Sequence, residues 1–89
     1  MSQHEKLIER MRSTPQNIRF EEVLAVTRWL GLSCRNPAGS HDIFTWPGSG
    51  LIVTVARPKS GGHVKAVYIR TLLSQLEAYG IIPGGGNDE

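Results

Sequence analysis

The hydrophobic positions of this chain recur with a helical spacing at both ends and with a two-residue spacing in the middle. Near the N-terminus, apolar side chains at positions 7, 8 and 11 fall on one stripe, and Ser2 and Glu5 have the separation of a capping box. This pattern predicts a short helix at about 3–12. The sequence Ser-Thr-Pro that follows it ends the helix.

Two longer helices are predicted from wider apolar stripes. The first covers 20–30, carries two glutamates in its first turn, where the helix dipole favours them, and is followed by Gly31. The second covers about 68–79 and ends at Gly80. The stripes consist of Phe20, Val23, Leu24, Thr27 and Leu30 in the first helix and of Ile69, Leu72, Leu73 and Leu76 in the second.

Between these helices the residues have the character of β-strands. We expect strands at 32–36, 41–46 and 51–56, separated by turns rich in proline and glycine. The middle strand alternates, with one side made of His41, Ile43 and Thr45 and the other of Asp42, Phe44 and Trp46. The strands should form an antiparallel meander. Because one face of such a sheet must be covered, the two longer helices should pack side by side on it.

The predicted fold class is therefore α+β, in the order helix, helix, three strands, helix. A chain of 89 residues has room for one domain, which we place at 1–82, followed by a disordered tail at 83–89. The residues expected in the core are Phe20, Leu24, Leu30, Phe44, Val53, Val55, Leu72, Leu73 and Leu76.

The composition is that of a soluble globular protein, with 39% hydrophobic and 20% charged residues. No apolar run approaches the roughly 20 residues that a membrane helix needs. The N-terminal segment lacks the apolar region of a signal peptide, so we expect a cytoplasmic protein. The single cysteine, Cys34, excludes an internal disulfide and is expected as a small buried hydrophobic residue.

The net charge is only +2, but the charges are unevenly distributed. Between positions 23 and 76 the chain has six basic residues and one acidic residue, Asp42. A central basic surface of this kind suits a polyanion such as nucleic acid. Ordinary solvated charge that keeps a small protein dispersed is the alternative interpretation.

The sequence Gly39-Ser40-His41 stands where a turn passes into the middle strand. Imidazole changes its charge near neutral pH, and glycine lets the backbone approach an anion closely. Ser40 adds a hydroxyl group. These residues suit the binding of a phosphate beside a titratable side chain, although a surface histidine with a structural role has the same sequence signature.

The loop at 57–65 supplies three cations, Arg57, Lys59 and Lys65. If they hold a phosphodiester, His41 can move a proton to or from an attacking 2′-hydroxyl, which requires no metal. The three histidines are far apart in the sequence and have no ligand spacing, so no metal site is expected.

Four segments together resemble the HicA family of mRNA interferase toxins. They are RFEEVLAVTRWLG before the first strand, GSHDIF at the second, the basic loop with Lys65, and YIRTLLSQLEAYG as the last helix. In this order and spacing they cover about residues 5–80.

The resemblance implies a fold like that of double-stranded-RNA-binding domains, α-β-β-β-α, here preceded by an extra short helix. It also implies cleavage of messenger RNA without the ribosome and a HicB-type antitoxin that covers the active site. His41 matches the family's catalytic histidine, and Gly39 and Ser40 complete its motif. Acidic Asp42 follows the histidine, where the family more often has a basic or polar residue. An acid there would raise the pKa of the imidazole or repel a phosphate.

Two other functions fit the same sequence: a non-catalytic RNA-binding module, and a protein-interaction module whose basic surface meets an acidic partner. Trp29 is expected in packing and Trp46 in the core, unless Trp46 is exposed and stacks on a base. His63, in the glycine-rich loop, is expected as an exposed residue, with a second acid–base role as the alternative.

Overall fold

A computed structural model of the chain describes residues 2–36, 39–59 and 62–84. Its elements follow in the order α1 (Gln3–Ser13), α2 (Phe20–Leu30), β1 (Ser33–Arg35), β2 (His41–Thr45), β3 (Ile52–Ala56) and α3 (Ala66–Ala78). Helix α2 has its predicted bounds, and the other elements differ from prediction by one or two residues at an end. Most of the predicted tail and part of each of two predicted loops lie outside the described residues.

The predicted helix ends are formed by the expected contacts. The backbone N–H of Glu5 donates to Ser2 Oγ at 3.1 Å, and the backbone N–H of Ser2 donates to Glu5 Oε1 at 2.8 Å, which completes the capping box of α1. Helix α2 ends at Gly31, whose φ of 97° is in the left-handed region that favours glycine. The N–H of Gly31 donates to the Thr27 carbonyl, and the chain turns there into the sheet.

The three strands form an antiparallel sheet in the order β1-β2-β3, as the sequence predicts. Residues paired across neighbouring strands share a face of the sheet. One face, called the helix face, carries Cys34, Asp42, Phe44, Val53 and Val55. The other, called the open face, carries Ser33, Arg35, His41, Ile43, Thr45, Ile52, Thr54 and Ala56.

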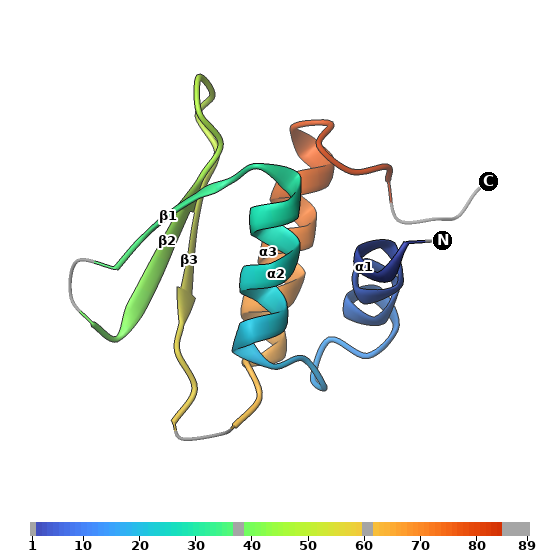
Figure 1. Cartoon of the computed structure of the whole chain (residues 1–89), viewed down its shortest axis with the longest axis vertical. Helices are drawn as coiled ribbons and strands as arrows, with labels where there is room; N and C mark the ends of the chain where they lie inside the picture. The colour runs from blue at the N-terminus through green and yellow to red at the C-terminus, as the bar shows by residue number, and fades with distance from the viewer. Residues whose placement is uncertain (1, 37–38, 60–61, 85–89) are drawn as a thin grey trace.

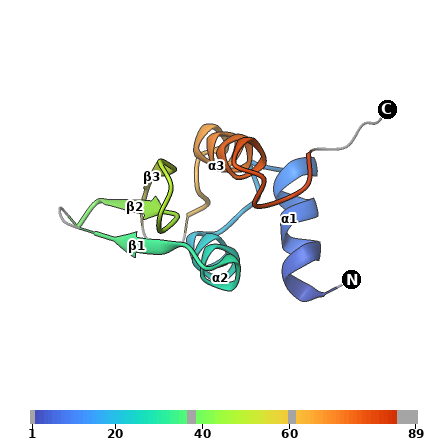
Figure 2. The same ribbon diagram turned by 90° about the horizontal axis from the view of Figure 1, so that it is seen from above.

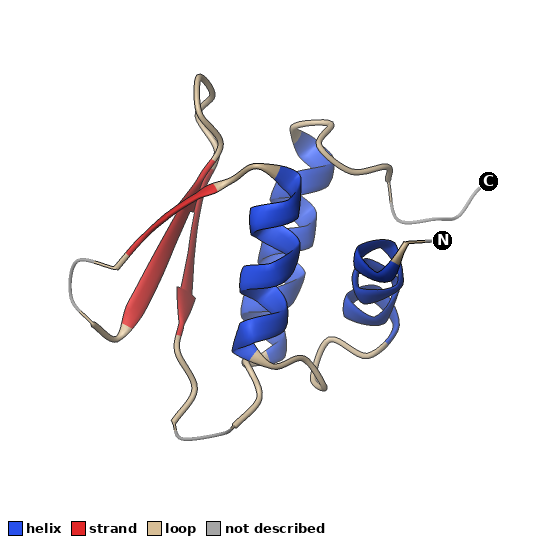
Figure 3. Ribbon diagram, in the orientation of Figure 1, coloured by secondary structure: helices blue, strands red, loops and turns tan. Residues whose placement is uncertain are grey.

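The elements form three layers (Figures 1 and 2). Helices α2 and α3 lie side by side and cover the helix face of the sheet, which confirms the predicted arrangement. Helix α1 runs across the side of α2 and α3 that faces away from the strands. All described helices lie on one side of the sheet (Figure 3). No described element therefore covers the open face.

The core lies between the sheet and the helices and continues between the helix layers. Six of the nine predicted core residues are buried: Phe44, Val53, Val55, Leu72, Leu73 and Leu76. Phe20, Leu24 and Leu30 instead pack against the core while partly exposed. The prediction omitted the residues that join α1 to α2 and α3, among them Ile8 and Met11. Trp46 is partly buried against the core, as expected. Within the described ranges, no helix is long and apolar enough to cross a membrane.

Candidate functional site

His41 begins β2 and lies on the open face of the sheet, exposed to solvent. Ser40 Oγ lies 3.0 Å from His41 Nδ1, which orients the imidazole. If Nδ1–H donates to the serine, Nε2 carries a lone pair and can accept a proton; if the serine donates, Nε2 carries the proton. Gly39 precedes this pair with a φ of 82°, a backbone conformation that favours glycine. The three consecutive residues of the motif therefore lie exposed at one end of the sheet.

The side chain of Asp42 points away from His41, to the helix face, and only 1% of the residue is exposed. Its carboxylate accepts hydrogen bonds from Arg57 Nε at 2.6 Å, from Arg57 Nη2 at 3.2 Å and from Asn36 Nδ2 at 2.7 Å. Cys34 Sγ donates to the same group at 3.1 Å. The alternation of the strand places Asp42 on the face opposite to His41, and its charge is paired with that of Arg57.

These contacts shift the pKa values of the groups involved. Burial alone raises the pKa of Asp42, but the hydrogen bonds from Arg57 and Cys34 outweigh burial, and the pKa lies below its ordinary value. The hydrogen bond to Asp42 raises the pKa of Arg57. Although the residue is exposed as a whole, partial desolvation of the Cys34 thiol and its hydrogen bond to the Asp42 carboxylate raise the pKa of the thiol to about 11. Cys34 is thus not the buried hydrophobic residue that we expected: the residue is exposed, and its thiol is a hydrogen-bond donor.

The backbone of Arg57 lies beside the histidine motif, whereas its side chain lies on the other side of the sheet. Its N–H donates to the Ser40 carbonyl at 3.0 Å, which extends the pairing of β2 and β3. Its guanidinium lies on the helix side of the sheet, bound to Asp42 and 4.9 Å from the ring centre of Phe20. Arg57 therefore fixes the end of the sheet behind the imidazole.

Helices α2 and α3 begin at the end of the molecule where β2 starts and β3 ends (Figure 1). The remaining predicted cations, Lys59 and Lys65, belong to the segment between β3 and α3. Lys65 directly precedes α3, whose first turn has no acidic residue and whose N-terminus has no side-chain cap. His63 pairs through its backbone with Arg19, just before α2, and is exposed as expected. Lys59 is exposed in the loop between β3 and α3. The start of α3 is electropositive, because the helix N-terminus adds a partial positive charge to that of Lys65.

Sequence reasoning did not assign Arg35 to the site. Arg35 is paired with Ile43, two residues along β2 from His41, so it lies on the open face diagonally across from the histidine. Diagonal neighbours of this kind are roughly 7 to 8 Å apart. The sequence did not fix this register, because a four-residue turn at 36–39 would pair Arg35 with Ser40, whereas the structure pairs Arg35 with Ile43. The side chain of Arg35 has no ion-pair or hydrogen-bond partner among the residues that the structure describes.

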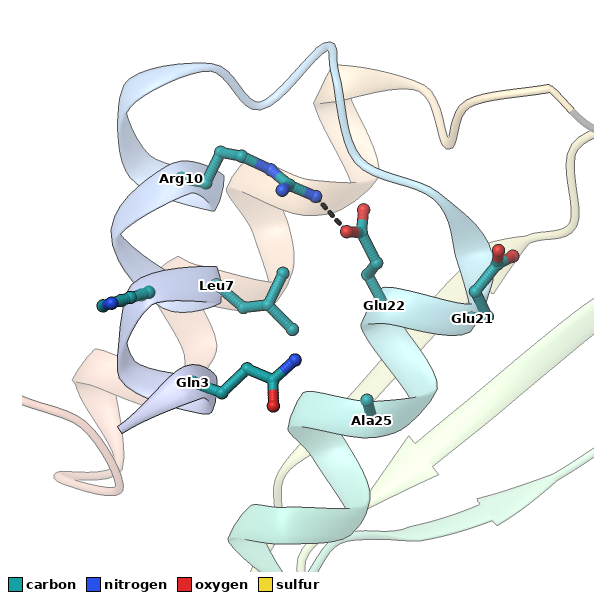
Figure 4. Close-up of a pocket in the computed structure, with 7 residues that line it drawn as sticks. Gln3, Leu7, Arg10, Glu21, Glu22 and Ala25 are labelled. Atoms are coloured by element: carbon teal, nitrogen blue, oxygen red, sulfur yellow. Dashed lines mark hydrogen bonds and ion pairs between the residues drawn. The ribbon is translucent and has the colours of Figure 1, made fainter. Parts of the chain in front are cut away.

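A groove of about 490 Å³ separates α1 from α2 (Figure 4). Its walls include Leu7, Ala25, and the ion pair of Arg10 with Glu22. It lies on the helix layers, away from the sheet face that carries His41. Among the described residues, no three of His, Cys, Asp or Glu are grouped so as to hold a metal ion.

No protein-family model, no curated protein and no solved structure matches this chain. The resemblance to the HicA family therefore rests on the sequence segments quoted above.

Proposed function

We propose that this protein is a HicA-type toxin, an endoribonuclease that cuts messenger RNA with His41 as general acid or base. The order of α2, the three strands and α3, with both helices on one face of the sheet, supports a fold like that of double-stranded-RNA-binding domains. Helix α1 is the addition to that fold. A HicB-type antitoxin is the proposed protein partner.

The observation that carries the proposal is the state of the His41 imidazole. It is exposed on a sheet face that no described element covers, while its Nδ1 is held by Ser40 at 3.0 Å. A histidine that serves only packing would be enclosed, and one that serves only solubility needs no oriented partner. An oriented ring with an open edge suits proton transfer to a bound substrate.

The proposed reaction is a transphosphorylation. The 2′-oxygen of a ribose attacks the adjacent phosphorus, the bond from phosphorus to the 5′-oxygen breaks, and the products carry a 2′,3′-cyclic phosphate and a 5′-hydroxyl. His41 either takes the proton of the 2′-hydroxyl or delivers one to the 5′-oxygen, a contribution of roughly 10²- to 10⁴-fold. Solvent water supplies or accepts the other proton. Gly39 and Ser40 admit the phosphate, and Lys59 and Lys65 hold neighbouring phosphates. Arg57 fixes the sheet end and, since 46% of its side chain is exposed, can also contact RNA.

The test compares wild type with His41→Ala and His63→Ala on labelled single-stranded RNA in the presence of EDTA. We expect wild type to cut and to leave 2′,3′-cyclic phosphate ends, His41→Ala to lose cutting and growth inhibition, and His63→Ala to keep both. Circular dichroism should show all three folded, because both imidazoles are exposed. Cutting by His41→Ala at the normal rate, or a need for a divalent metal, would refute the mechanism.

A non-catalytic RNA-binding module is the second candidate. It is favoured by one observation: Lys59 and Lys65 lie at the exposed helix N-terminal end, where they can bind phosphates without the help of His41. Tight binding of RNA by wild type without any cutting would select this candidate. If RNA does not bind but an acidic protein does, the basic surface is a protein-interaction surface.

A further inference from the structure

The open face of the sheet has a composition unlike that of the rest of the surface. Among its described residues there is no acid. It has one cation, Arg35, one imidazole, His41, and three hydroxyl side chains, Ser33, Thr45 and Thr54. The acid of the strands, Asp42, is turned to the helix face and neutralised by Arg57. The open face therefore offers positive charge and hydrogen-bonding groups without repulsion toward phosphate.

The same face carries exposed aliphatic surface. Ile52, on the edge strand β3, is 63% exposed, and Ile43 in the middle of the face is partly exposed. From the row of His41 to the row of Ile52 the face extends four residues along the strands, about 13 Å at the usual rise. The unstacked bases of a single strand can lie against such side chains, whereas the bases of a duplex are stacked inside it and cannot.

We infer that single-stranded RNA crosses this open face on its way to His41, with Arg35 binding a phosphate next to the one that is cut. The inference rests on the proposed function and extends it by naming the surface that binds the RNA and a residue on that surface, Arg35, that contacts it. Arg35 lies on the same face as the imidazole and is its diagonal neighbour, whereas the guanidinium of Arg57 lies behind the sheet. Arg35 is thus the described arginine that shares a surface with the reacting group.

The first test removes the cation. Arg35→Gln is compared with Arg70→Gln, which removes the same charge from an exposed position on α3, on the other side of the sheet. All binding measurements are made in the His41→Ala protein, so that labelled single-stranded RNA is not cut. We expect Arg35→Gln to weaken binding about 10- to 100-fold and to reduce the slope of log affinity against log salt by about 0.7, the value for one phosphate contact on a single strand. Arg70→Gln should leave both nearly unchanged.

The second test introduces an acid on the proposed path. Ile52→Glu places a carboxylate on the open face, and Ser74→Glu places one on an exposed position of α3. We expect Ile52→Glu to weaken single-stranded RNA binding by about 10-fold or more through repulsion of phosphate, and Ser74→Glu to change it less than about 2-fold. A duplex of the same sequence should compete for the site at least about 10-fold less well than the single strand.

Each result bears on a distinct claim. If wild type cuts RNA while Arg35→Gln and Ile52→Glu bind like their controls, the inference is wrong although the proposed function stands, and Arg35 serves only to keep an edge strand soluble. Equal competition by duplex RNA would also overturn it. If wild type neither binds nor cuts single-stranded RNA, the proposed function fails and the inference fails with it.

Discussion

At the scale of single residues, the carboxylate of Asp42 connects parts of the chain that lie far apart in the sequence. It accepts hydrogen bonds from Cys34 and Asn36, which precede the turn before β2, and from Arg57, which follows β3. The side chain of Asn36 also accepts the N–H of Gly39. A single buried acid therefore holds both the turn that leads to His41 and the start of the basic loop.

We predict that Asp42→Asn lowers the free energy of unfolding at pH 7 by roughly 1 to 3 kcal/mol, because charge-assisted hydrogen bonds become neutral ones. The folded-state pKa of Asp42 lies below its ordinary value of 3.8. Its ionised form therefore stabilises the fold fully above about pH 5, and this contribution is lost as the pH falls through the lower folded-state pKa. The difference between wild type and variant should accordingly shrink in acid.

Urea unfolding at pH 7 and at steps down to about pH 2 measures this difference. Glu21→Gln is the matched control, since Glu21 is exposed, and it should be nearly neutral throughout. A gap between Asp42→Asn and wild type that stays constant from neutral pH into acid would show that the carboxylate is not held in its ionised form.

At the scale of elements, α1 is a structural layer rather than an appendage. Its residues Ile8 and Met11 are buried, and the side chain of Met11 is fully enclosed. Arg10 pairs with Glu22 of α2, and Arg12 pairs with Glu77 of α3, so α1 is tied to both longer helices. Removal of α1 would expose the side of α2 and α3 that it covers.

We predict that Met11→Ala lowers the free energy of unfolding by about 2 to 5 kcal/mol, as expected for truncating a buried side chain. Lys6→Ala on the exposed side of α1 should change it by less than about 0.5 kcal/mol. Thermal and urea unfolding of the two variants measure the contrast. Equal, small effects would mean that α1 is not part of the cooperative fold.

At the scale of the whole molecule, the cations proposed to bind RNA lie in two regions. Lys59 and Lys65 belong to the segment between β3 and α3, and Arg35 lies on the open face. Under the proposed function, an RNA strand bound at His41 and an acidic antitoxin would both use these regions. RNA and antitoxin should therefore exclude each other.

We predict that Lys59→Gln combined with Lys65→Gln weakens RNA binding across unrelated sequences and lowers the salt slope by up to about 1.4, because two phosphate contacts are lost. Binding is measured in the His41→Ala protein by fluorescence anisotropy at several salt concentrations. Purified antitoxin, added in steps, should release the RNA. An unchanged slope would place the RNA away from these lysines, and a complex that holds both RNA and antitoxin on one chain would contradict a shared surface.

Much of the fold was predictable from the sequence because its signals are local. The apolar stripes, the Ser2–Glu5 capping box and Gly31 determined the helices, and the alternation of β2 by itself assigned His41 and Asp42 to opposite faces of the sheet. The meander needs a cover on one face only, and the two longer helices supply it on the side that carries Phe44, Val53 and Val55.

Only the tertiary structure decided which charged side chains pair with each other and which face solvent. In the sequence Arg57 is one more cation of the basic loop and Asp42 an acid beside the histidine, but the folded chain binds them to each other behind the sheet. The same contacts turn Cys34 into a donor to a carboxylate, and the packing of α1 on α2 and α3 buries Met11. Ion pairs and helix–helix contacts depend on distances between residues far apart in the chain, and a local pattern contains no information about those distances.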